Sequence, residues 1–174
     1  GFFPGILLGW NITNESFFNV PFINYMKLRA SYGQMGNDQV FFNGQLQEFA
    51  YLPTYGFGEY PINSAVVTTL QETVLANPSF TWEVANNFNV GLDATFFDNR
   101  FDLTLEYFYN RRDQILIQET GSTPASSGIN ELLPPVNAGI VDNRGFEFNL
   151  GYNLAPRGDL RLRAGVNGGY AKNE

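Results

Sequence analysis

The sequence predicts an all-β chain whose roughly six antiparallel strands form a segment of a transmembrane β-barrel. Three observations predict this fold class. Apolar side chains recur at every second residue in stretches of about ten residues or slightly more, the length of a tilted strand that crosses a bilayer. The connections between these stretches are alternately short and long. The 174 residues contain no apolar run long enough for a transmembrane helix.

The clearest alternation lies on either side of a break at residues 98–100. The apolar side chains are even-numbered over residues 88–96 and odd-numbered over residues 101–109. Paired residues in a hairpin share a face, so only a connection with an even number of residues keeps the apolar faces together. We therefore expect a turn of two or four residues, in which Asp98 and Asn99 tolerate positive φ.

Four further strands are predicted from the same alternation. Two precede the hairpin, at residues 6–12 and 26–33, and two follow it, at residues 146–154 and 160–170. In the second pair both apolar faces are even-numbered, so their connection must be odd in length. A turn at residues 155–159 satisfies this requirement.

Two long segments, at about residues 34–80 and 119–141, lack regular alternation. Loops of this length are usually functional or disordered, and the aromatic residues of the first segment argue against disorder. Long connections on one side of the sheet and short ones on the other are typical of outer-membrane barrels. We therefore expect both segments to be extracellular loops.

The best ligand candidates are aromatic residues of the first loop, because aromatic faces stack on sugar rings or on peptide side chains. They are Tyr51, Tyr55, Phe57 and Tyr60. Packing between loops, or contact with a partner protein, is the alternative explanation for them.

The composition excludes several classes of site. The sequence contains no cysteine and no histidine, which removes disulfides, thiol nucleophiles, histidine-based metal sites and a Ser-His-Asp relay. The formal charge of -7 argues against nucleic acid as a partner. We expect no enzymatic activity, no metal and no cofactor.

Four stretches of the sequence, taken together, resemble one known family. They are FFPGILLGW at residues 2–10, LRASYGQMGN at 28–37, NPSFTWEVANNFNVGLDATFFDNRF at 77–101 and NAGIVDNRGFEFNLGY at 137–152. In this order they resemble the C-terminal barrel region of SusC/RagA-type TonB-dependent outer-membrane transporters. The third stretch is the most specific.

The resemblance implies that residues 1–174 are part of a single barrel domain of about 22 strands, whose plug domain lies outside this chain. It implies active import of an oligosaccharide or peptide across the outer membrane of a Gram-negative bacterium. The implied partners are outer-membrane lipid, a SusD-like surface lipoprotein, and TonB, which acts through the absent N-terminal region. Both ends of the chain lie at patterned segments, so we interpret it as a piece of a longer protein.

The polar faces of the strands would then look into the barrel, toward the lumen or the plug. The charged residues expected there are Asp93, Asp102, Glu106, Glu147, Arg161 and Arg163. An acid/base set is the other interpretation of the carboxylates, but the sequence shows no nucleophile and base in a defined geometry. We expect the two arginines to pair with carboxylates or with the plug.

Two other functional hypotheses remain open from the sequence. The barrel could be a scaffold subunit of a larger outer-membrane assembly. The chain could also be a soluble β-sandwich binding module, whose apolar faces would pack against a second sheet.

Overall fold

The computed structural model describes residues 1–39, 41–42, 45–46, 49, 51–118, 121, 123–129, 132–154 and 162–174. These residues form antiparallel sheets and two short 3-10 helices, η1 (Ile12–Asn14) and η2 (Ala125–Ser127). In the described part of the chain, no helix has the length and apolar character needed to cross a membrane. The predicted all-β class is confirmed.

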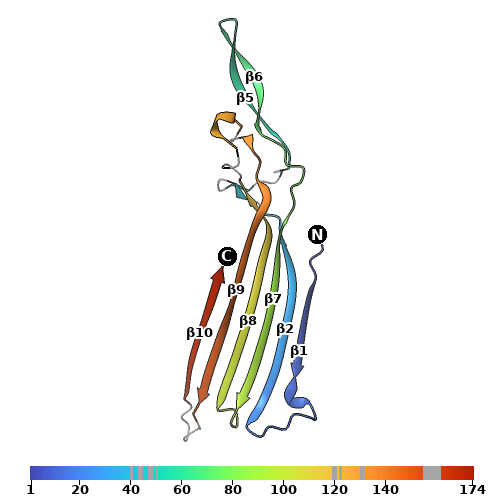
Figure 1. Ribbon diagram of the computed structural model, residues 1–174, viewed down its shortest axis with the longest axis vertical. Coiled ribbons are helices and arrows are strands. Elements are labelled where there is room, and N and C mark those ends of the chain that lie inside the picture. The colour runs from blue at the N-terminus through green and yellow to red at the C-terminus, as the bar shows by residue number, and fades with distance from the viewer. Residues whose placement is uncertain are drawn as a thin grey trace. The chain divides into compact units, whose positions relative to one another are not determined.

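The main sheet has six strands in the order β1-β2-β7-β8-β9-β10 (Figure 1). Their bounds are β1 Gly5–Asn11, β2 Ile23–Asn37, β7 Glu83–Phe96, β8 Phe101–Ile117, β9 Val136–Asn153 and β10 Arg163–Asn173. The six predicted strands are therefore confirmed, but the four inner ones are longer than expected, at 14 to 18 residues. They continue past the apolar stretch because a hydrogen-bond ladder does not depend on apolar side chains.

The connection between β7 and β8 has four residues, 97–100, which is one of the two predicted turn lengths. Asp98 and Asn99 have φ angles of 57° and 61°, as expected from their tolerance of positive φ. Phe97 also has a positive φ, of 51°, which its residue type does not predict. Its N–H donates to the Phe22 carbonyl at 2.9 Å, and the two rings stack with centroids 5.9 Å apart. These contacts stabilise the unusual backbone conformation.

The pairing of β9 with β10 has the predicted parity. Even-numbered residues face even-numbered residues, as in the pairs of Leu150 with Val166 and Phe146 with Tyr170. The apolar faces of the two strands therefore coincide, as a half-buried sheet requires. The predicted turn at residues 155–159 lies outside the described residues.

The segment at residues 34–80 is not irregular throughout, which corrects the sequence-based prediction. It contains a hairpin of β5 (Thr54–Ile62) and β6 (Ala65–Val74). The turn residues Asn63 and Ser64 both have positive φ, of 50° and 69°, as a tight two-residue hairpin turn needs. Apolar side chains stand on both faces of this hairpin, so the strict alternation that marks a one-sided strand is missing.

Two smaller differences concern the same loops. Residues Phe41–Phe42 and Gln45–Leu46 pair as the short strands β3 and β4. Strand β9 already begins at Val136, so the second loop is shorter than the predicted range of 119–141.

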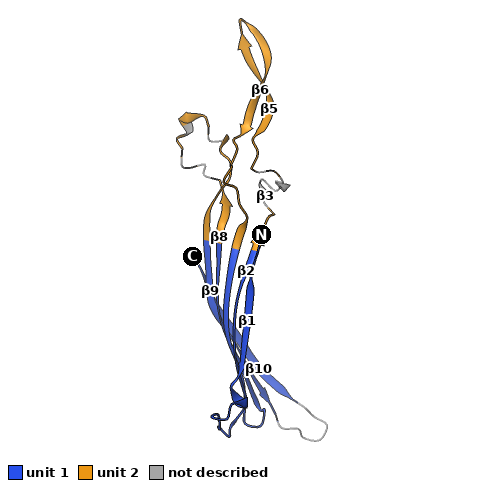
Figure 2. Ribbon diagram, turned by 90° about the vertical axis from the view of Figure 1, so that its right-hand side faces the viewer, with its two compact units in different colours: residues 1–35, 85–112, 141–174 blue, residues 36–84, 113–140 orange. Residues whose placement is uncertain are grey.

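The chain divides into two compact units (Figure 2). The first comprises Gly1–Met35, Ala85–Arg112 and Val141–Glu174, and it holds β1, β10 and most of each inner strand. The second comprises Gly36–Val84 and Asp113–Ile140, and it holds the long connections with the β5–β6 hairpin.

In the second unit, Asn77 fixes two loop segments to each other. Only 7% of Asn77 is exposed. Its side-chain Nδ2 donates to the Pro135 carbonyl at 2.8 Å, and its Oδ1 accepts the Ser79 N–H at 3.1 Å. The amide thus satisfies backbone groups that the loops would otherwise leave without partners.

Asn137 forms a similar link in the same unit. Its Nδ2 donates to the carbonyls of Thr81 and Gln114 at 2.8 and 2.7 Å, and its Oδ1 accepts the Thr81 N–H at 3.0 Å. Asn137 therefore joins the stretch at residues 77–101 to the stretch at 137–152. These are two of the four stretches that carry the family resemblance.

We predict that Asn77→Ala increases protease cleavage within residues 75–82 about tenfold. The substitution removes two hydrogen bonds at a buried position, which costs roughly 1–2 kcal/mol of local stability. Limited proteolysis of the full-length protein, with cleavage sites assigned by mass spectrometry, measures the effect. Ser79→Ala is the matched control, because only the backbone N–H of Ser79 takes part, and it should leave cleavage unchanged. Equal cleavage of Asn77→Ala and wild type would contradict the proposed link.

Candidate functional site

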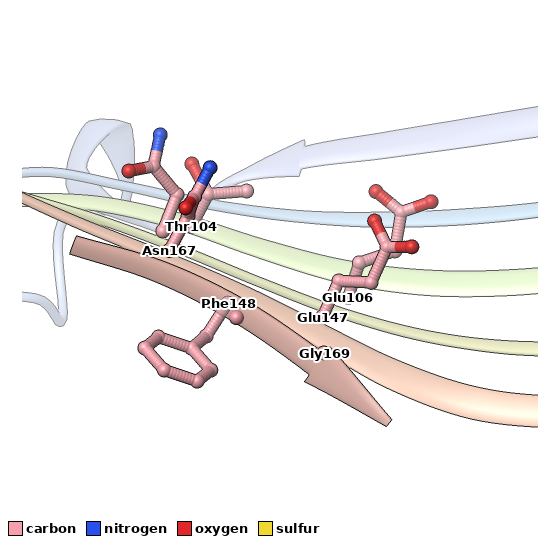
Figure 3. A pocket seen from close by; sticks show the side chains of 8 residues that line it. Thr104, Glu106, Glu147, Phe148, Asn167 and Gly169 are labelled. Carbon is pink, nitrogen blue, oxygen red and sulfur yellow. The ribbon is translucent and has the colours of Figure 1, made fainter. Parts of the chain in front are cut away.

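The main sheet has one apolar face and one polar face. Figure 3 shows Glu106, Glu147 and Asn167 projecting from one side of the first unit and Phe148 from the other. The apolar side is not covered by protein, since exposure reaches 40% at Phe88 and 51% at Phe146. Among the described residues, no second sheet packs on this face, as a soluble β-sandwich would require.

On the polar face, Arg29 links three neighbouring strands. Its Nε lies 2.7 Å from the Asp93 carboxylate on β7, and its Nη2 lies 3.4 Å from the Glu106 carboxylate on β8. The guanidinium lies over Gly91, where a Cβ atom would come within 2.7 Å of Nη2. Gly91 therefore leaves the space in which Arg29 reaches both carboxylates. The side chains of this triad are 29% to 36% exposed.

A second ion pair lies on the same face, on β8 and β10. The Arg163 guanidinium lies 2.7 Å from the Asp102 carboxylate, and Asn153 Nδ2 donates to Asp102 at 3.3 Å. Arg163 thus pairs with a carboxylate, as expected. Arg161 lies outside the described residues.

The structure also shows what sequence reasoning missed on the polar face. Asp93, Glu106 and Asp102 were expected there, but Arg29, which pairs with two of them, was not singled out. A signal was present, because Arg29 is a cation at an odd-numbered position of its strand, and the odd-numbered residues of this strand lie on the polar face. Its partners could not be named without the register between β2, β7 and β8.

Between β8, β9 and β10 the polar face is hollowed, with a volume of about 400 Å³. The lining residues include Thr104, Glu106, Glu147, Asn149 and Asn167. The carboxylates of Glu106 and Glu147 point in the same direction, away from Phe148 (Figure 3). In the described part of the chain, no three carboxylates gather closely enough to hold a metal ion.

The four aromatic ligand candidates do not form one patch. Directly paired residues in β5 and β6 share a face, and successive residues alternate between faces. Tyr55 and Phe57 therefore lie on one face, with Phe57 opposite Leu70 and 84% exposed. Tyr60 lies on the other face, and Tyr51 precedes the hairpin.

A sheet with an uncovered apolar face, a polar face held by ion pairs and long connections on one side is typical of the wall of a transmembrane β-barrel. The comparison with protein families agrees with this class. Residues 1–174 match the family described as TonB dependent receptor-like, beta-barrel, and the chain belongs to this family. The resemblance to SusC/RagA-type proteins is confirmed.

The chain is similar to parts of much longer proteins. TonB-dependent receptor P26 of Formosa agariphila is 33% identical over 155 residues, which cover 86% of this chain and 14% of that protein. TonB-dependent receptor SusC of Bacteroides thetaiotaomicron is 28% identical over 155 residues, which cover 86% of this chain and 15% of that protein. This chain spans only 14% to 16% of the length of the curated relatives it matches.

The fold is also similar to solved structures. The structure of the RagAB peptide importer in the "open-open" state matches with a TM-score of 0.77 and 22% sequence identity, covering 99% of this chain and 18% of that one. The "closed-closed" state matches with a TM-score of 0.73. At this identity the likeness concerns the fold.

Proposed function

We propose that this chain forms part of the barrel wall and extracellular loops of a transporter in the outer membrane of a Gram-negative bacterium. The transporter imports a large nutrient, an oligosaccharide or a peptide, with energy delivered through TonB. Its partners are outer-membrane lipid and a SusD-like surface lipoprotein. TonB acts through an N-terminal region that lies outside this chain.

The observation that carries the proposal is the sheet with an uncovered apolar face opposite a face held by ion pairs. An apolar face of this kind would be unstable in water but stable against lipid tails. The family membership and the names of the relatives support the same function.

Uptake by the full-length protein tests the proposal. Cells that carry the gene should accumulate labelled oligosaccharides or peptides, and both a gene deletion and a TonB deletion should abolish this accumulation. The full-length protein should need detergent for extraction and should migrate differently on gels before and after heating. A protein that is extracted without detergent would contradict the membrane assignment.

A scaffold role in a larger outer-membrane assembly is the alternative, and the same strains distinguish it. A scaffold would be recovered in the outer membrane with its partners, but its deletion would disrupt the assembly without affecting TonB-dependent uptake.

For the polar face, we propose that the carboxylates Asp93, Asp102, Glu106 and Glu147, with Arg161 and Arg163, look toward the lumen or the plug. Arg29 and Arg163 form ion pairs with three of these carboxylates, which supports a role in stabilising the wall rather than in chemistry.

The charge of the second unit favours neutral or cationic cargo. Its ranges, residues 36–84 and 113–140, contain no lysine or arginine, although the whole chain has 10 of them. Their acidic residues are Asp38, Glu48, Glu59, Glu72, Glu83, Asp113, Glu119 and Glu131. Segments of this composition repel polyanions and attract cations at low salt.

Within this unit, we propose that cargo contacts the hairpin face that carries Tyr55 and Phe57. Phe57→Ser should weaken binding of the imported oligosaccharide or peptide about fivefold, since one aromatic contact contributes about 1 kcal/mol. Titration calorimetry on the full-length protein measures this. Tyr60→Ser, on the opposite face, is the matched comparison and should change affinity less than twofold. A larger effect from Tyr60→Ser than from Phe57→Ser would place the cargo contact on the other face of the hairpin. Tyr51 and Tyr60 would then be the candidates for cargo binding.

A further inference from the structure

The apolar face of the main sheet ends in charged residues near the C-terminal end of β10. Phe146 of β9 pairs with Tyr170 of β10, and the ring centroids are 6.1 Å apart. The next pair on the same face is Arg144 with Lys172. Paired residues share a face and alternate with their neighbours, so these charges follow directly after the last aromatic pair on the apolar face.

One further pair continues this series. Asp142 and Glu174 exchange both backbone hydrogen bonds at 2.9 Å, so they also lie opposite each other. The Glu174 carboxylate lies 2.9 Å from the Arg144 guanidinium and also contacts the Lys172 ammonium.

Strand β8 adds to the same group of charges. Arg111 lies 3.8 Å from the Asp142 carboxylate, and the Tyr109 hydroxyl donates to Asp142 at 3.1 Å. We call this group the charged belt. It consists of Arg111, Asp142, Arg144, Lys172 and Glu174.

The distance from the charged belt to the short turns matches the height of the apolar band of an outer-membrane barrel. Phe101 and Tyr152 are in ring contact near those turns, with centroids 4.6 Å apart. Asp142 precedes Tyr152 by ten residues, or about 33 Å along an extended strand. For a barrel strand tilted by roughly 40°, this projects to about 25 Å, the height of the apolar band of an outer-membrane barrel. The belt therefore falls where lipid tails give way to headgroups.

We propose that the charged belt binds phosphate-bearing headgroups of outer-leaflet lipids. The inference rests on the proposed function, which places this face in the outer membrane with the long connections outside. The belt has three cations and two carboxylates, and the side chains of Arg144 and Lys172 are 50% and 48% exposed. Glu174 holds the side chains of Arg144 and Lys172 next to each other, and these two exposed cationic groups complement an anionic headgroup.

Position on the outward face distinguishes the belt from the polar network of Arg29. The lumen side of a barrel can be filled by the protein itself, whereas the outward side meets lipid all the way round. Long cationic side chains at such a boundary extend toward the headgroups and cover apolar surface with their stems.

Lipid binding by the full-length protein in detergent tests the proposal. The probe is bis-phosphorylated lipid A, compared with the same lipid after removal of its phosphates, and native mass spectrometry measures the bound fraction. Arg144→Gln with Lys172→Gln should weaken binding of the phosphorylated lipid about 30-fold, because each cation near an anionic surface contributes about 1 kcal/mol. The dephosphorylated lipid should bind wild type and variant equally.

The matched control removes two cations from the polar face, as Lys27→Gln with Arg112→Gln, and should change binding less than twofold. Equal binding of both lipids by wild type, or an unchanged affinity in the belt variant, would overturn the inference. Full competition by inorganic phosphate at the same concentration as the lipid phosphate would also overturn it, because the belt would then bind free anions. If the lipid-binding test fails but the wild-type protein still imports cargo, the inference is refuted and the proposed function stands. If the wild-type protein is absent from the outer-membrane fraction, both the inference and the proposed function are refuted.

Discussion

Gly145→Val is expected to prevent assembly of the sheet at the β9–β10 pair. Gly145 lies opposite Ala171, and a Cβ atom there would overlap the backbone carbonyl oxygen of Tyr170 and would lie 2.6 Å from the Phe108 ring. A backbone oxygen in a hydrogen-bond ladder cannot move aside without breaking the ladder. We expect a loss of at least about 3 kcal/mol in the free energy of unfolding. The folded, heat-modifiable band on a gel and a urea titration measure it.

Gly33→Val is the control for this prediction. Gly33 also lies within a strand, paired with Gly5, but a Cβ atom there would have its nearest neighbour, the Gly5 Cα, at 4.0 Å. This spacing is ordinary van der Waals contact, so the change should cost less than about 1 kcal/mol. A similar loss in both variants would mean that valine disturbs the barrel by some means other than the predicted overlap.

The strands of the main sheet could be predicted because one face of each must be apolar and the other polar. This requirement gives the sequence an apolar residue at every second position. Apolar residues are even-numbered before residues 98–100 and odd-numbered after them, which predicts a turn with an even number of residues. The β5–β6 hairpin could not be predicted in the same way. Apolar residues such as Phe57 and Tyr60 stand on opposite faces, so no single face is marked.

The sequence predicts which charged residues lie on the polar face, but it does not predict which of them form ion pairs. Alternation places Asp93, Asp102 and Glu106 on the polar face, but ion pairing depends on which strands are neighbours and in which register. Arg29 and Asp93 are 64 residues apart in the sequence, and local patterns carry no information about such a contact. For the same reason, the hydrogen bond between Asn137 and Thr81 could not be predicted, although both residues belong to stretches that carry the family resemblance.

Arg29→Met is expected to destabilise the barrel wall through charge rather than through packing. Methionine keeps most of the apolar stem, so the loss comes from leaving the carboxylates of Asp93 and Glu106 without their shared cation. A fully buried charge left alone costs about 3–5 kcal/mol, but these side chains are about one third exposed, so we expect roughly 2 kcal/mol. Urea unfolding of the full-length protein in detergent measures this difference.

A charge-neutral background separates the two causes. Adding Asp93→Asn and Glu106→Gln to Arg29→Met removes the uncompensated negative charge, and should restore most of the lost stability if electrostatics is responsible. If the loss came from packing, the triple variant would be at least as unstable as Arg29→Met alone. Lys27→Met is the control on the same strand and face, where the side chain lies over Gly9, and it should cost less than about 0.5 kcal/mol. The ion pairs of Arg29 thus depend on Gly91 as well, since any larger residue there would occupy the space of the guanidinium.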